Sequence, residues 1–137
     1  MTYILWIVLK KDVCINVGSL GKIFFKNGAY LYIGSAKRAY KARIKRHLSA
    51  RKKIFWHIDY FLSRRYNRIK EIWLSQKIAE CAAAGAFYNK GYDFIDKFGS
   101  SDCSCRSHLF FTKRNLYSLK KELISLGFNN EDKNNFR

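Results

Sequence analysis

The sequence contains no proline and only ten acidic residues. Its turns must therefore be built with Gly, Asn, Asp and Ser, and these residues do separate the apolar runs. The acidic residues are outnumbered by 27 Lys and Arg, so the formal net charge is +17 over 137 residues. Because this self-repulsion destabilises a compact chain, we expect a phosphate-rich nucleic acid as the partner rather than an acidic membrane surface.

Long hydrophobic runs and the features of a secretory signal are also missing. No window approaches the roughly 18 apolar residues of a membrane-spanning helix, and the first residues lack a basic region and a cleavage site. The four cysteines are too few and too unevenly spaced for the disulfide framework of a small secreted domain. We therefore expect a cytoplasmic protein with no membrane contact and no obligate protein partner, and the sequence leaves its oligomeric state open.

The apolar pattern predicts one α/β (α+β) domain over residues 1–128, with a small mixed or antiparallel sheet flanked by helices. Runs rich in β-branched residues predict four early strands in an antiparallel meander: residues 3–11, 13–17, 22–25 and 30–34. Helical spacing predicts helices at 36–48 (with Ser35 as N-cap), 56–66, 77–88 and 116–126. Alternation of charged and apolar residues predicts a strand at 68–74, and a short strand is expected at 108–112. The polar tail, residues 129–137, is expected to be frayed.

Positive charge is concentrated in one segment. Residues 13–58 contain no Asp or Glu, so the cations there have no acidic neighbours to relieve their repulsion. A solvated helix face is the ordinary explanation of a charge run, but the missing counter-charges favour contact with phosphates. We predict that eight of these cations bind the nucleic acid: Lys37, Arg38, Lys41, Lys45, Arg46, Arg51, Lys52 and Lys53.

Three residues have the chemistry of a phosphodiester site. Arg43 and His47 lie one helical turn apart, beside the expected buried stripe of the 36–48 helix. A guanidinium there can bind a phosphate and an imidazole can exchange a proton, although a boundary arginine and a structural histidine fit the spacing equally well. Glu80 lies in an alanine-rich helix, where a carboxylate either pairs with a cation such as a neighbouring arginine or holds a metal such as Mg²⁺.

These residues resemble a known signature. Tyr32-Ile33-Gly34, followed by Arg43 and His47, is similar to the second half of the GIY-YIG nuclease motif, and Glu80 matches that family's metal-binding glutamate. Within that family the resemblance is to a mostly archaeal branch catalogued as a domain of unknown function. It covers nearly the whole chain, through residues 28–36, 43–47, 56–60, 80–81 and 98–109.

The first half of the signature departs from the family pattern. Where Gly-Ile-Tyr is expected, the chain has Met1-Thr2-Tyr3, which lacks the glycine. We therefore assign Tyr3 and Tyr32 as the paired tyrosines of neighbouring strands, joined by an inserted N-terminal β-hairpin over residues 13–25.

The resemblance implies a DNA endonuclease that acts in DNA repair or processing, with structure or damage specificity. It implies one divalent ion, Mg²⁺ or Mn²⁺, held by Glu80, and an Arg43 that stabilises the charge on the phosphoryl oxygens. Tyr3, Tyr32 or His47 would align or deprotonate the attacking water. His57 would line the cleft with the DNA-binding cations. The alternative is a nucleic-acid-binding module that keeps the fold and does not cut, which the missing glycine favours.

The cysteines allow a second interpretation. Cys103, Cys105 and His108, joined by the distant Cys81, have the residue types of a Cys₃His zinc site. Because the Cys-x-Cys interval is tighter than a usual zinc knuckle, packed thiols or a disulfide are favoured over zinc.

Two acidic residues have local explanations. Asp59 is expected to pair with Arg64 or Arg65, which lie close in sequence. Asp102, in the polar turn Ser100-Ser101-Asp102, is either a turn cap or a second metal ligand.

Overall fold

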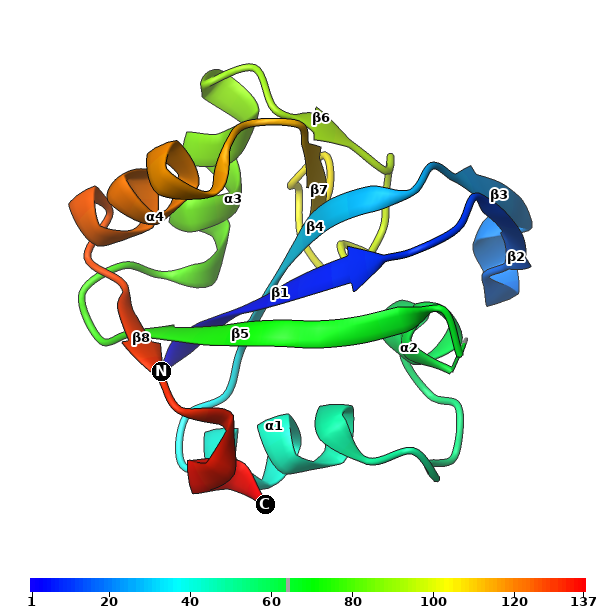
Figure 1. Cartoon of the computed structure of the whole chain (residues 1–137), viewed down its shortest axis with the longest axis horizontal. Helices are drawn as coiled ribbons and strands as arrows, with labels where there is room; N and C mark the ends of the chain where they lie inside the picture. Colours follow the sequence, from blue (N-terminus) through cyan, green and yellow to red (C-terminus); the bar gives the residue numbers. More distant parts are fainter. Residues whose placement is uncertain (64) are drawn as a thin grey trace.

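The architecture is a six-stranded antiparallel sheet, seen in a computed structural model that describes residues 1–63 and 65–137. The order across the sheet is β6-β7-β4-β1-β5-β8 (Figure 1). These strands are β1 (Thr2–Leu9), β4 (Gly28–Ser35), β5 (Asn67–Ser75), β6 (Asp93–Phe94), β7 (Leu109–Thr112) and β8 (Asn129–Glu131). Every pairing in the sheet is antiparallel, which agrees with the predicted fold class.

The central strand β1 is buried on both faces, as its uninterrupted apolar sequence predicts. Side chains alternate across a strand, so Ile4 and Trp6 enter one core while Tyr3 and Leu5 enter the other. The sheet therefore separates two hydrophobic cores, and the two tyrosines of the predicted site belong to only one of them.

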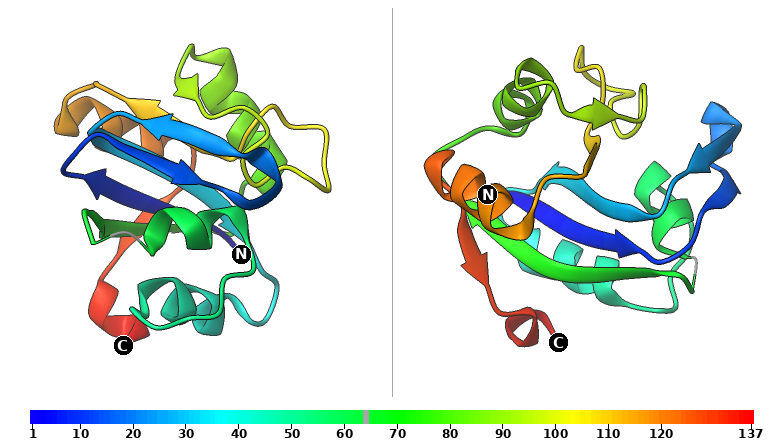
Figure 2. Two further views of the ribbon diagram at one scale, coloured as in Figure 1. Left: turned by 90° about the vertical axis from the view of Figure 1, so that its right-hand side faces the viewer. Right: turned by 45° about the horizontal axis from the view of Figure 1, so that its top comes forward.

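Helices cover both faces of the sheet and produce three layers (Figure 2). One core is closed by α1 (Tyr40–Leu48), α2 (His57–Leu62) and the separate hairpin of β2 (Val13–Asn16) and β3 (Lys22–Phe25), which contribute Ile44, Phe61 and Phe25. The other core is closed by α3 (Glu80–Asn89) and α4 (Leu116–Ser125), which contribute Phe87 and Leu123. The inserted hairpin is confirmed, but the four early strands do not form one meander: β2 pairs only with β3, and β4 returns to β1.

The predicted starts of two helices are wrong, and α2 ends at Leu62, earlier than the predicted residue 66. Ser35 ends β4 and does not cap α1, which begins at Tyr40 after Ala39. Glu80 is the first residue of α3 and does not lie in the helix interior. There it lies at the positive end of the helix dipole, which stabilises a carboxylate without any partner arginine.

The prediction of a frayed tail is wrong. In β8, Asn130 pairs with Trp73 of β5, and a short 3₁₀ helix (Lys133–Phe136) follows. Phe136 is buried in the same core as Ile44 of α1. The β8–β5 pairing and the burial of Phe136 together dock this polar segment, because backbone hydrogen bonds and apolar burial both oppose the entropy lost on ordering it.

Candidate active site

A cavity of about 270 Å³ opens on the α1–α2 side of the sheet. It is lined from β1, β4, α1, α2, the N-terminus of α3 and the loop after β6. Four predicted catalytic residues contribute to its wall: Tyr3, Tyr32, Arg43 and Glu80. Its other lining residues are Gly34, Ser35, Phe55, Trp56, His57, Gly99, Ser101 and Asp102.

The two tyrosines lie side by side because of the β1–β4 register. Tyr3 is opposite Gly34, and Leu5 is opposite Tyr32, so both phenol rings leave the same face of the sheet on neighbouring strands. Gly34 has a steric purpose here: a Cβ at this position would lie 2.4 Å from Cζ of Tyr3. Only glycine allows the Tyr3 ring to lie against β4 at this point.

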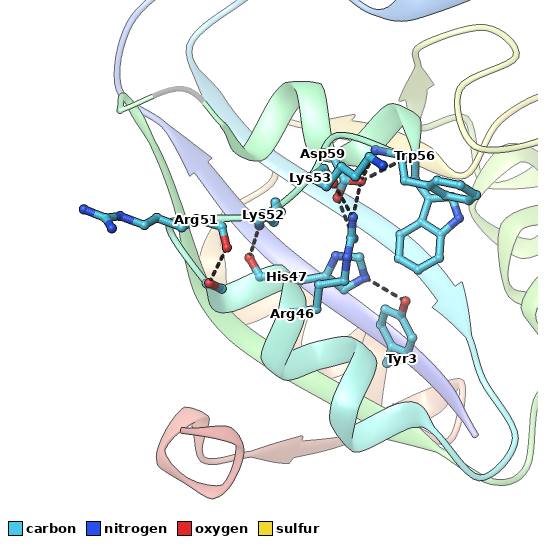
Figure 3. Close-up of polar contacts among 10 residues, drawn as sticks. Tyr3, Arg46, His47, Arg51, Lys52, Lys53, Trp56 and Asp59 are labelled. Carbon is cyan, nitrogen blue, oxygen red and sulfur yellow. Dashed lines mark hydrogen bonds and ion pairs between the residues drawn. The ribbon is translucent and has the colours of Figure 1, made fainter.

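His47 lies behind Tyr3 and away from the cavity wall. Its side chain is only 2% exposed, and its Nε2 is 2.9 Å from the phenolic oxygen of Tyr3 (Figure 3). Burial, followed by the nearby charge of Lys52, lowers the pKa of His47 to about 3, so the imidazole is neutral at physiological pH. The prediction that His47 lies at the edge of the core is wrong. His47 lies inside the core, behind the cavity wall, and its hydrogen bond to that wall is made with Tyr3.

The proton of this neutral imidazole can be assigned. Nδ1 of His47 is buried and has no hydrogen-bond partner among residues 1–63 and 65–137. Orphaned buried N–H groups are rarer than unpaired acceptors, so we place the proton on Nε2, which then donates to the phenolic oxygen of Tyr3. Burial raises the pKa of both Tyr3 and Tyr32, with Arg43 opposing this effect, so both phenols are protonated at neutral pH.

Arg43 is held at the cavity mouth by two contacts. One guanidinium nitrogen donates to the backbone carbonyl of Ser35 at 2.6 Å. The guanidinium carbon also lies 4.9 Å from the ring centre of Trp56, a cation–π distance. These contacts orient Arg43 before any ligand binds.

Arg46 is engaged in a structural ion pair. It donates to both carboxylate oxygens of the buried Asp59, at 2.9 and 2.7 Å (Figure 3). Asp59 also accepts from the backbone N–H groups of Phe55 and Trp56. Burial alone would raise the pKa of Asp59, but the hydrogen bonds from Arg46 and the backbone outweigh it and lower the pKa.

The predicted partner of Asp59 is therefore corrected. Arg64 lies outside the described residues, and Arg65 donates to Tyr66. Asp59 pairs instead with Arg46 of α1, which fixes the connection between α1 and α2 at the mouth of the cavity.

The predicted DNA-binding residues fall into two groups. Six are exposed to solvent: Lys37, Arg38, Lys41, Lys45, Arg51 and Lys53. The other three have internal partners. Arg46 binds Asp59, Lys52 donates to the backbone carbonyl of His47 at 2.7 Å, and Nδ1 of His57 accepts from the backbone N–H of Gly99 at 2.9 Å.

Glu80 faces the cavity from the start of α3. Its side chain is 28% exposed, and its Oε1 lies 3.5 Å from Nδ1 of His108. His108 is its only ion-pair partner within the described parts of the chain, so the expected pairing with an arginine is not found there. The carboxylate is thus accessible to a cation that enters the cavity.

A family model described as "Domain of unknown function DUF123" matches residues 2–127. The chain belongs to this family. No curated protein and no solved structure matches the chain. Every residue of the cavity wall lies inside the DUF123 match. None of the helices in residues 1–63 and 65–137 combines the length and the apolar character that crossing a bilayer requires.

A second group of side chains in the DUF123 domain could hold a metal ion. It consists of Cys81, Cys103, Cys105 and His108, whose ligand atoms all lie within 4.8 Å of one another. The four cysteines of the chain are free, so the disulfide that was one favoured interpretation is not formed.

Sequence reasoning missed two features of the cavity. Phe55 is 77% exposed and lies on its wall. The available signal was its position close after the basic run Arg51-Lys52-Lys53, in the apolar segment Ile54-Phe55-Trp56 that leads into the predicted helix. Ser101 also reaches the wall, and a polar turn alone did not predict this.

Proposed function

We propose that this chain is a metal-dependent DNA endonuclease that hydrolyses phosphodiester bonds. One observation carries the proposal: Tyr3, Tyr32, Arg43 and Glu80 come from four separate elements and meet in one cavity. The resemblance to GIY-YIG nucleases implies this constellation. The glycine missing from its first half is not needed to place Tyr3, because the ring is accommodated by Gly34 across the strand pair.

The donor set of the cavity suits Mg²⁺ or Mn²⁺. Glu80, Asp102 and Ser101 present carboxylate and hydroxyl oxygens to the same space, and hard divalent cations prefer oxygen ligands. Glu80 would be the main ligand, with Asp102 as a further one. When bound, the ion would supply Lewis-acid polarisation of the scissile phosphate and charge stabilisation of the leaving oxygen.

Arg43 then serves as the electrostatic clamp. Its carbonyl and aromatic contacts orient the guanidinium in advance, so little reorganisation is needed when charge develops on the phosphoryl oxygens. An oriented guanidinium at this position can bind a phosphate bidentately.

Tyr3 and Tyr32 orient the attacking water. Because Nε2 of His47 donates to Tyr3, the phenolic hydrogen of Tyr3 remains available to a water or a phosphate oxygen. The same N–H would stabilise a phenolate if Tyr3 gave up its proton, and Arg43 acts in the same direction. His47 is thus a positioning residue that acts through Tyr3.

DNA would reach the cavity across the exposed cations of the 37–53 segment, with Phe55 placed to stack on a base that has left the helix. A stacking residue beside the catalytic wall favours substrates with unpaired bases. The exposed Phe55 beside the cavity supports the proposed role in DNA repair or processing, with structure or damage specificity.

The test is cleavage of plasmid, nicked, flapped, abasic and uracil-containing DNA, with and without Mg²⁺. We expect Glu80→Gln and Arg43→Ala to lower the cleavage rate by about 10²–10³-fold. Glu131→Gln and Arg68→Ala, which change the same residue types away from this cavity, should cut like the wild type. Failure of the wild type to cut any substrate, or unchanged cutting by Glu80→Gln, would refute the proposal.

The burial of His47 favours a second candidate, a nucleic-acid-binding module without cleavage, because the strongest potential base has no direct access to the cavity. This module would bind the same DNA with a steep salt dependence and leave it intact. Binding measured by fluorescence anisotropy beside the cleavage assay separates the two functions.

A further inference from the structure

The Cys81–Cys103–Cys105–His108 cluster has the composition and spacing of a zinc centre. Sγ of Cys103 lies 3.5 Å from Nε2 of His108. On a tetrahedral Zn²⁺, with Zn–S of about 2.3 Å and Zn–N of about 2.0 Å, neighbouring sulfur and nitrogen ligands are about 3.5 Å apart. Three thiols and one imidazole form one of the standard closed sets for structural zinc.

The backbone brings these ligands together from distant parts of the sequence. Cys81 is on α3, whereas Cys103 and Cys105 belong to the irregular loop between β6 and β7. That loop is closed at its base by bonds from the N–H of Lys97 to the carbonyl of Arg106 and from the N–H of His108 to the carbonyl of Phe98. Long irregular loops in small domains need a reason to stay ordered, and a metal centre supplies one.

His108 connects the cluster to the cavity. Its two ring nitrogens face different groups: Nε2 faces Cys103, and Nδ1 faces Oε1 of Glu80 at 3.5 Å. The imidazole is 2% exposed, so this orientation is set by packing and not by solvent. Zinc-bound histidines regularly donate their other N–H to a carboxylate, which fixes both groups.

We propose that Cys81, Cys103, Cys105 and His108 bind a structural Zn²⁺ and that this centre positions the active-site carboxylate of Glu80. Glu80 would be held twice: its backbone precedes the ligand Cys81, and its Oε1, now 3.5 Å from Nδ1 of His108, would accept a hydrogen bond from that ligand. Oε2 then stays available to the cation in the cavity. The zinc assignment stands without the proposed nuclease function, while the role of Glu80 rests on it.

Metal content tests the zinc assignment. Protein purified without a polyhistidine tag should contain about one Zn²⁺ per chain, measured by inductively coupled plasma mass spectrometry. Cys105→Ser should lose most of it, while Cys14→Ser, which changes the exposed cysteine outside the cluster, should keep it. Replacement by Co²⁺ should give the visible absorption of a tetrahedral thiolate site. A wild type that takes up neither ion, or a disulfide among the cluster cysteines, would overturn the assignment.

The link to Glu80 is tested by His108→Cys. This variant offers four thiolates, a standard zinc set, so zinc content should remain at the wild-type level, but the contact with Glu80 is gone. We expect its cleavage rate to fall about 10-fold or more. Retention of zinc with full cleavage would overturn the positioning role.

A third variant addresses the same link without DNA. Glu80→Gln should keep the zinc but release it about 10- to 100-fold more readily to a competing chelator, because the carboxylate acceptor of His108 is lost. Unchanged zinc affinity would refute the coupling. If the zinc results hold and no DNA is cut, the proposed function fails while the zinc centre stands.

Discussion

Replacing Gly34 by alanine is the most direct test of how the fold builds the cavity. The added Cβ would lie 2.4 Å from Cζ and 2.5 Å from the hydroxyl oxygen of Tyr3. Ordinary carbon contacts are about 3.5–4.0 Å, so the ring must move by more than about 1 Å. Tyr3 is on the buried central strand, which cannot yield, so the ring itself must swing away from β4.

The expected cost follows from two terms. Overpacking of a well-packed site costs about 1–3 kcal/mol, and loss of the 2.9 Å bond between Tyr3 and His47 adds about 1 kcal/mol. The free energy of unfolding of Gly34→Ala should therefore fall by about 2–4 kcal/mol in urea titrations followed by circular dichroism. Cleavage should fall with it, because Tyr3 leaves the wall of the cavity.

Two further variants make this result specific. Gly85→Ala, in the interior of α3 with nothing within 4 Å of the new Cβ, should be neutral or stabilise by about 0.5–1 kcal/mol. Combining Gly34→Ala with Tyr3→Leu removes the clashing ring, so the two changes should be non-additive by more than about 1 kcal/mol. If Gly34→Ala unfolds at the same urea concentration as the wild type, the steric argument is refuted.

Three other outcomes are expected. The neutral, buried His47 has a pKa of about 3, whereas an unfolded histidine titrates near about 6.5. Stability should therefore fall by about 2.5 kcal/mol in urea titrations as the pH drops from about 7 to about 4.5, and His47→Gln should lack this loss. Asp59→Asn should lower the unfolding free energy by about 2–3 kcal/mol in the same assay, since Arg46 loses its charged partner. Phe55→Ala should weaken binding of flapped DNA, measured by anisotropy, by about 1–3 kcal/mol without changing stability.

Each of these outcomes has a matched control. His57→Gln changes a more exposed histidine, and it should keep most of the acid dependence of the wild type. Asp96→Asn breaks an exposed ion pair and should cost less than about 0.5 kcal/mol. Tyr117→Ala removes an exposed aromatic residue of α4 and should leave DNA affinity unchanged. Equal effects of a variant and its control would contradict the corresponding argument.

The sheet and most helices were predictable because their signals are local. An apolar run predicts β1, and alternation of charged and apolar residues predicts β5. The resemblance to a motif singles out Tyr32, Arg43 and Glu80, which the structure brings into one cavity. The helix starts near Ser35 and Glu80 could not be predicted, because capping and packing decide where a helix begins.

Pairings between distant residues could not be predicted from one sequence. Asp59 binds Arg46 across the α1–α2 connection instead of a sequence neighbour, because the fold of that loop decides which guanidinium reaches the buried carboxylate. Likewise, the approach of Cys81 to the Cys103–Cys105 pair depends on α3 packing beside the loop after β6. The burial of His47 depends on the same kind of packing, around α1.

The C-terminal residues lie beyond the family match, yet they pair with β5 and pack in the core beside α1. The DUF123 match ends at residue 127, whereas β8 and the buried Phe136 follow it. A chain truncated at that limit would leave the outer edge of β5 unpaired and remove an aromatic support from α1, the helix that holds Arg43. A fragment that ends at the family boundary would therefore be prone to edge-to-edge association, and its α1, which carries Arg43, would be less stable.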